Sequence, residues 1–272
     1  MSDLRLPREL CQLFADGGKG RRLPVELPPG DVVWPDPGYT GHGEASRPAF
    51  WMSDEPVSGA AWTLMREWHP HSGLWPLLLD ESTQPWGIGQ IIPDDPRQIE
   101  HFTAEGFMTE VWQEWVARMP QDALEELEPY GAICPGPAAP GVLKADPEAV
   151  ADWLAGELAV KGMPLGLVAA DRSADALTIM GWQGALHHNE WMVPMAAVVR
   201  SWEDRFGARV VSVGFNTLDL SVAAPPVDAE HALQVAAEHW AFCPDNVVQG
   251  PGDLQGYAEQ IIGAHAWSFW WD

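Results

Sequence analysis

The chain has 272 residues, of which 46% are hydrophobic and 16 are tryptophan, so it can bury the core of one large domain or two small ones. Fifteen Lys and Arg oppose 39 Asp and Glu, which gives a net charge of −24 with histidine counted as neutral. The tryptophan content excludes low-complexity disorder, and the charge opposes binding to nucleic acid phosphates or anionic lipid.

The first part of the chain, residues 1–145, is rich in Pro, Gly and Trp and predicts short helices and a strand. Short helices are expected near Pro7–Ala15 and Gly59–Trp68, and the apolar run Leu74–Leu79 predicts a buried strand. The stretch Leu23–Phe50 shows little periodicity and is expected to be irregular chain. A further helix is predicted over 104–118, because its apolar residues recur at helical spacing before Pro120.

The second part, residues 146–272, is expected to form an α+β domain, and the Pro- and Gly-rich stretch over 131–147 marks the boundary before it. Four helices are predicted from their starting signals, an Asp cap or a Pro in the first turn: Asp146-Pro147, Pro194, Asp228 and Asp253. Five strands are predicted over 165–170, 176–182, 209–215, 217–223 and 266–271.

In the strand predicted over 217–223, the apolar residues Leu218, Leu220 and Val222 alternate with polar ones. This alternation favours one buried and one open face. Strands and helices do not alternate as they do in a doubly wound sheet. The predicted fold class is therefore α+β, a mostly antiparallel sheet with helices packed on one face, preceded by a Pro- and Gly-rich N-terminal α/β region.

Three widely spaced cysteines and the absence of a CxxC motif indicate neither a disulfide framework nor a zinc ribbon. The first 20 residues contain no apolar core typical of a signal peptide, and the longest near-apolar run, 191–199, is too short to span a bilayer. We therefore expect a cytoplasmic protein with no membrane or nucleic acid partner and no cofactor; the sequence leaves the oligomeric state open.

Three motifs in this second part carry a family resemblance: Ser201-Trp202-Glu203-Asp204-Arg205-Phe206-Gly207, Ala241-Phe242-Cys243-Pro244-Asp245-Asn246 and the final Trp267-Ser268-Phe269-Trp270-Trp271-Asp272. Over about residues 163–272 the chain resembles the bacterial, mainly actinobacterial, family named domain of unknown function 4253. The segment 63–79 is similar to the upstream part of longer members. The resemblance implies a shared fold and carries no assigned activity or catalytic residue.

The most conspicuous polar group is Cys243-Pro244-Asp245-Asn246, which follows a predicted helix. His239 lies four residues before Cys243, so the two side chains share one side of that helix and are candidates, with Asp245, for nucleophilic catalysis. No basic residue nearby in sequence would lower the pKa of the thiol. The alternative is a helix stop, in which Cys243 is buried, Pro244 breaks the helix, and Asp245 and Asn246 bond the local backbone.

Other candidates are weaker. His187 and His188 are potential metal ligands, although a site needs three or four converging ligands and adjacent residues of an extended segment point to opposite sides. Trp270 alternates with Ser268 and Asp272, so it is expected on the open face of the last strand, where it would serve as a recognition residue with Asn246 and Asp272 unless another segment covers it.

No complete catalytic signature occurs in the sequence: a phosphate-binding Gly-rich loop, GxSxG and HExxH are all absent. The functional hypothesis is thus a non-enzymatic protein-interaction module that binds a basic protein partner, for example as an immunity protein or antitoxin. The alternative is a hydrolase or transferase that uses the Cys/His pair, and the charge alone is also consistent with solubility.

Overall fold

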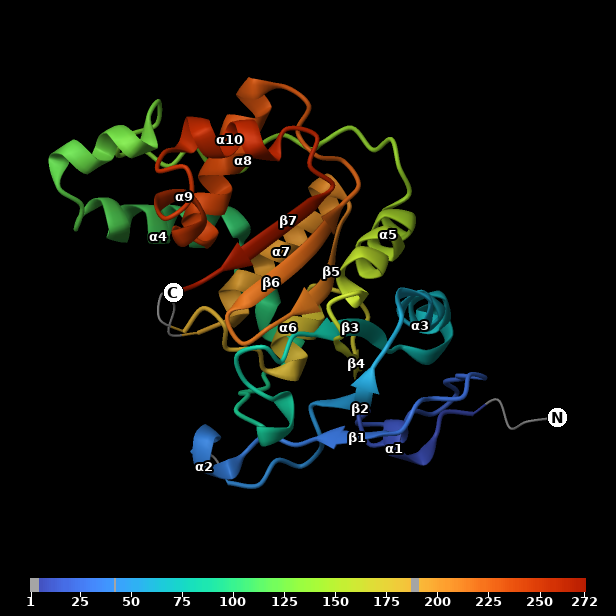
Figure 1. Ribbon diagram of the computed structural model, residues 1–272. Helices are drawn as coiled ribbons and strands as arrows, with labels where there is room; N and C mark the ends of the chain where they lie inside the picture. The colour runs from blue at the N-terminus through green and yellow to red at the C-terminus, as the bar shows by residue number, and fades with distance from the viewer. Residues whose placement is uncertain (1–4, 42, 187–190) are drawn as a thin grey trace. The chain divides into compact units, whose positions relative to one another are not determined.

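The computed structural model describes residues 5–41, 43–186 and 191–272, and it divides into two compact units (Figure 1). Unit 1 comprises 1–96, 151–184 and 210–215, and unit 2 comprises 97–150, 185–209 and 216–272. These units interleave along the chain, so neither coincides with the ranges 1–145 and 146–272. The division of the sequence at 145 stays a prediction.

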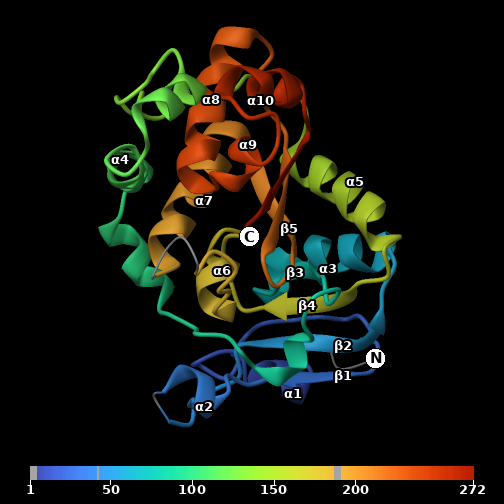
Figure 2. The same ribbon diagram turned by 60° about the vertical axis from the view of Figure 1, so that its left-hand side comes forward.

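Unit 1 is built on strands hydrogen-bonded in the order β1-β2-β4-β3-β5. The β1–β2, β2–β4 and β4–β3 pairs are antiparallel, and Figure 2 shows β1, β2 and β4 side by side. The β3–β5 pair is parallel, with Leu78 opposite Ser212 and Leu79 opposite Val213. The strand bounds are β1 Gly30–Val33, β2 Phe50–Pro56, β3 Trp75–Leu79, β4 Pro164–Val168 and β5 Ala208–Val213.

Unit 1 also contains helices that flank these strands. Every residue of β3 and β4 is buried, so this part of the sheet is covered on both faces. Trp62 of α3 and Trp75 of β3 meet edge to face with ring centroids 6.1 Å apart, within an aromatic core. The helix bounds are α1 Arg8–Cys11, α2 Pro37–Thr40, α3 Gly59–Ser72, the 3₁₀ helix η1 Trp86–Ile88, α5 Pro147–Ala159, which begins in unit 2, and α6 Asp175–Met180.

Unit 2 contains the antiparallel pair β6–β7, with Leu220 opposite Trp267 and Leu218 opposite Phe269. All four residues are buried, and Trp267 and Phe269 pack against aromatic side chains of helices α7 and α8; the Trp202 ring, for example, stacks on Phe269 with centroids 5.4 Å apart. The bounds are η2 Pro96–His101, which begins at the edge of unit 1, α4 Ala104–Val116, η3 Gln121–Leu127, α7 Val193–Phe206, β6 Thr217–Val222, α8 Ala229–Phe242, α9 Asp245–Val248, α10 Leu254–Ile261 and β7 Ala266–Trp270. The α+β class and the mostly antiparallel pairing are confirmed.

In unit 2 the residues predicted to start and end helices do so. The side chains of Asp228 and Asp253 accept hydrogen bonds from backbone N–H groups at the starts of α8 and α10. Gly207 ends α7 with φ of 59°, a left-handed conformation that favours glycine. These caps fix the ends of the helices that cover the β6–β7 pair.

Three predictions of secondary structure were wrong. Residues 176–182 are not a strand: they form most of α6, and Trp182 N donates to Leu177 O at its end. The prediction failed because a short apolar run fits a buried helix as well as a strand. Helix α3 continues through Pro70 to Ser72, where His69 Nε2 lies 2.7 Å from Ala170 O and holds the last turn. The supposedly irregular chain before Phe50 contributes β1, which gains its order from pairing with β2.

Candidate functional site: the edge of strand β7

The segment Cys243–Asn246 begins where α8 ends. Cys243 leaves the helical conformation with φ of −148° and ψ of 85°, while its N–H still donates to His239 O at 2.7 Å. Pro244 cannot continue the helix, because its ring would clash with the carbonyl one turn earlier, and it opens the short helix α9 instead. The turn therefore directs the side chains of Cys243, Asp245 and Asn246 toward β7.

Those side chains satisfy the free backbone edge of β7. The Asn246 amide donates to Ser268 O at 2.6 Å and accepts from Trp270 N at 3.2 Å, as a neighbouring strand would. Cys243 Sγ lies 3.0 Å from Trp270 O, to which its thiol donates, and Asp245 Oδ2 accepts from Asp272 N at 3.0 Å. We call Cys243, Asp245 and Asn246 the edge lock, because they occupy backbone groups that could otherwise pair with another chain.

The edge lock extends inward to α10 and α8. Asn246 Nδ2 also lies 3.2 Å from the hydroxyl of Tyr257, and that hydroxyl lies 3.1 Å from Nδ1 of His239. Asn246 is 8% exposed and His239 is fully buried. The buried side-chain amide of Asn246 thus connects α9, α10 and β7. These contacts explain why a polar residue stands in an otherwise apolar region.

The three catalytic candidates do not assemble into a nucleophilic site. The side chain of Cys243 is hydrogen-bonded to Trp270 O and Asn246, whereas the partner of His239 is Tyr257. Burial raises the pKa of Cys243 from 9.0 to about 12, and burial lowers the pKa of His239 from 6.5 to about 3. Near neutral pH the thiol is therefore protonated and the imidazole is uncharged, which is the opposite of the ion pair that an activated cysteine needs.

The buried thiol leads to a chemical prediction. Iodoacetamide should modify Cys11 and Cys134, which are partly exposed, in native protein at pH 8, and should leave Cys243 unmodified until the protein unfolds. Peptide mapping by mass spectrometry, with and without denaturant, measures the three residues in one sample. Modification of native Cys243 at a rate equal to that of Cys11 would contradict the edge-lock geometry.

The metal candidates His187 and His188 lie outside the described residues. Within the described ranges, no group of three or more His, Cys, Asp or Glu side chains is placed to hold a metal ion.

Trp270 lies on the opposite face of β7 from the aromatic core. Its side chain is 37% exposed, whereas Trp267, Phe269 and Trp271 are buried. On the same open face Ser268 Oγ donates to Asp219 Oδ1 at 2.6 Å, and Asp272 is exposed two residues further on. The open face of β7 thus carries Ser268 and Trp270 beside Asp219 of β6, and the exposed Asp272 follows the end of the strand.

A buried ion pair in unit 2 was missed by the sequence reasoning. Arg205 donates to both carboxylate oxygens of Glu238, at 2.7 Å and 2.5 Å, and the same carboxylate accepts from Trp202 Nε1 at 2.8 Å and from Ala138 N at 2.7 Å. Arg205 also reaches Ser201 Oγ at 2.9 Å, so the first of the three sequence motifs is explained by these contacts. The available signal was Glu238 itself, a charged residue inside the apolar run of α8.

These features define an α+β protein whose polar carboxyl-terminal motif locks a strand edge. Residues 164–272 match the family model described as Domain of unknown function (DUF4253), which confirms the resemblance recognised in the sequence over this range. No curated protein and no solved structure matches the chain. None of the described helices is both long enough and apolar enough to cross a membrane.

Proposed function

We propose that the protein is a non-enzymatic interaction module that binds a basic protein partner in the cytoplasm. The single observation that carries this proposal is Trp270, a large aromatic side chain that stays exposed on a strand held by four hydrogen bonds along its edge. Exposed tryptophans on rigid backbone are typical anchors of protein interfaces, because little conformational entropy is lost when they are buried.

The electrostatic setting supports a basic partner. Asp219 is bonded to Ser268 on the open face of β7, the exposed Asp272 follows Trp270 by two residues, and the chain as a whole carries a charge of −24. Such a field accelerates association with a cationic surface and weakens as salt is added. Neutralisation of a basic toxin, as an immunity protein or antitoxin, is a concrete version of this function. The chemistry of the edge lock gives no support to the alternative of a Cys/His enzyme.

The test compares tagged full-length protein with Trp270→Ala in affinity purification from the native host, at about 50 mM and about 300 mM salt. We expect a stoichiometric basic partner at the lower salt. Binding of that purified partner should weaken at least tenfold in Trp270→Ala, since an anchor of this kind contributes about 2 kcal/mol or more.

The matched control is Trp153→Ala. Trp153 lies on α5 and is 50% exposed, so it is a surface tryptophan outside the proposed interface. The control should bind as the unmodified chain does. The proposal would be refuted if no stoichiometric partner were recovered at either salt concentration. It would also be refuted if Trp270→Ala and Trp153→Ala weakened binding of the partner equally.

A further inference from the structure

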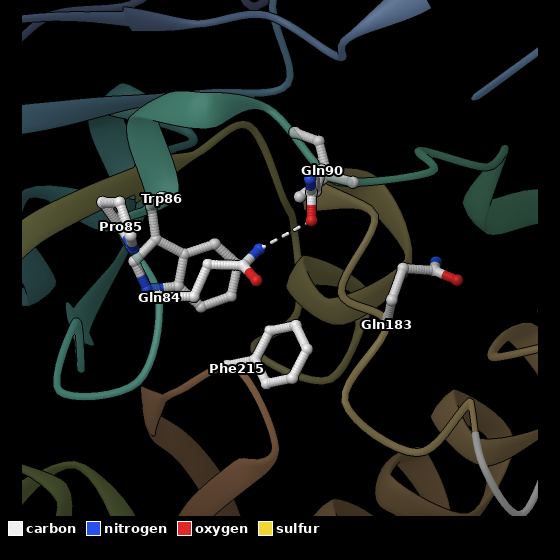
Figure 3. A pocket seen from close by; sticks show the side chains of 7 residues that line it. Gln84, Pro85, Trp86, Gln90, Gln183 and Phe215 are labelled. Atoms are coloured by element: carbon white, nitrogen blue, oxygen red, sulfur yellow. Dashed lines mark hydrogen bonds between the residues drawn. The ribbon is translucent and has the colours of Figure 1, made fainter. Parts of the chain in front are cut away.

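A pocket in unit 1 is lined by residues that belong neither to the edge lock nor to the proposed interface. Its empty volume of about 330 Å³ includes space open to solvent, so the pocket is partly open and is not an enclosed cavity (Figure 3). Its walls come from the loop after β3, the chain after α6 and the chain after β5. Because β3 and β5 are parallel, two of these walls stand at carboxyl ends of adjacent parallel strands, where open α/β sheets place their ligands.

The pocket walls are fixed in place before any ligand binds. Trp86 donates through its backbone N–H to Glu81 Oε1 at 2.9 Å and through Nε1 to Asp80 O at 3.1 Å. On the other side, Trp182 Nε1 donates to Gly214 O at 2.9 Å and so holds the residue before Phe215. A ligand would therefore bind with little loss of protein conformational entropy.

The lining is neutral although the chain is strongly acidic. Three of the seven lining residues carry primary amides, and these are Gln84, Gln90 and Gln183. The other four are apolar or aromatic, and none of the seven is charged. An anionic ligand would find no lysine or arginine in this lining and would be repelled by the net charge of −24.

Two groups provide specific recognition. Gln84 Nε2 donates to Gln90 Oε1 at 3.1 Å, and Figure 3 shows these two amides directed toward each other, with that of Gln183 directed away. The second N–H and the Oε1 of Gln84 have no partner among the described residues, so one planar amide offers a donor and an acceptor side by side. Phe215 is 43% exposed and offers a ring face for stacking.

We propose that this pocket binds an uncharged nucleobase, presented as the free base or as a nucleoside. A carboxamide matches the adjacent donor and acceptor on the edge of a base, as in the pairing of glutamine with adenine. An aromatic side chain supplies the stacking surface that planar bases use. The lack of cations in the lining selects against the phosphorylated forms.

The test is isothermal titration calorimetry of the full chain with adenosine, guanosine, cytidine and uridine, each up to about 5 mM, several times the ~1 mM dissociation constant of a weak ligand. We expect at least one nucleoside to bind, and its 5′-monophosphate to bind at least fivefold more weakly. Gln84→Ala and Phe215→Ala should each weaken binding about tenfold or more. Both residues are partly exposed, so both variants should fold, which thermal unfolding checks.

The matched control is Gln255→Ala, which removes an exposed glutamine on α10 and should leave nucleoside binding unchanged. Absence of binding for all four nucleosides would overturn the proposal. The proposal would also be overturned if Gln84→Ala and Phe215→Ala bound the nucleoside as tightly as the unmodified chain does. Tighter binding of the monophosphate, or binding of a neutral monosaccharide in place of any nucleoside, would have the same consequence.

Discussion

Arg205→Met is expected to lower the free energy of unfolding by about 3–5 kcal/mol, because it leaves the carboxylate of Glu238 buried without its cation. Glu238 is 2% exposed, and Arg205 supplies two of its hydrogen bonds. The substitution also removes one of the two hydrogen bonds that hold Ala138, since Arg205 Nη1 donates to Ala138 O at 2.9 Å. Urea unfolding followed by circular dichroism measures the change.

A double-mutant cycle separates this ion pair from simple loss of packing. Glu238→Leu alone should also destabilise the protein, because Arg205 then keeps a buried charge, whereas the double variant should cost clearly less than the sum of the two. The matched control is Arg118→Met, which breaks the exposed pair of Arg118 and Glu114 on α4 and should cost under about 1 kcal/mol. Strict additivity of the two buried substitutions would contradict the interpretation.

The helices of unit 2 were predictable because their signals are local. An Asp cap, a first-turn Pro or a terminal Gly acts within four residues of its own position, so Asp228, Asp253 and Gly207 could be interpreted from the sequence alone. Strand β1 could not, because it becomes a strand only by pairing with β2, about twenty residues later. Likewise, nothing in the apolar run of α6 distinguishes a helix from a strand.

The contacts of the candidate residues Cys243, Asp245 and Asn246 depend on partners that are distant in the sequence. The helix-stop hypothesis anticipated a buried Cys243 and a helix broken at Pro244, which the structure shows. It expected Asp245 and Asn246 to bond the local backbone, and this was wrong: their side chains reach backbone groups of residues 268–272. Spacing along the chain cannot reveal a contact that depends on where β7 lies.

The ion pair was missed for a related reason. A glutamate in a helix is normally assigned to the solvated face, and only the position of Arg205 on a different helix makes burial of Glu238 favourable. Sequence reasoning therefore recovers the elements and their caps more readily than the polar contacts between them.

Acid is expected to destabilise the protein through His239. Its imidazole is enclosed by Trp202, Trp267, Phe269 and Tyr257, and the ring centroid of Trp267 is only 4.4 Å away. Burial, reinforced by the nearby positive charge of Arg205, lowers the pKa from 6.5 to about 3 in the folded protein. Between these two values the unfolded chain binds a proton that the folded chain does not.

The sign follows from that difference in bound protons. Because the unfolded state binds more protons below pH 6.5, the free energy of unfolding falls as the pH falls, by up to about 1.4 kcal/mol per pH unit and by about 5 kcal/mol in total near pH 3. The contribution of His239 is most distinct between about pH 4.5 and 6.5, above the range in which most carboxylates titrate. There it should amount to about 2–3 kcal/mol.

The variant His239→Phe isolates this contribution, since phenylalanine fills a similar volume and cannot be protonated. Urea unfolding from about pH 4.5 to 7.5 should show a shallower loss of stability for the variant than for the unmodified chain, so that the two curves converge or cross as the solution becomes more acidic. Equal slopes for His239→Phe and the unmodified chain would mean that the imidazole gains a proton in the folded state as easily as in the unfolded one, which an aromatic enclosure that excludes water does not permit.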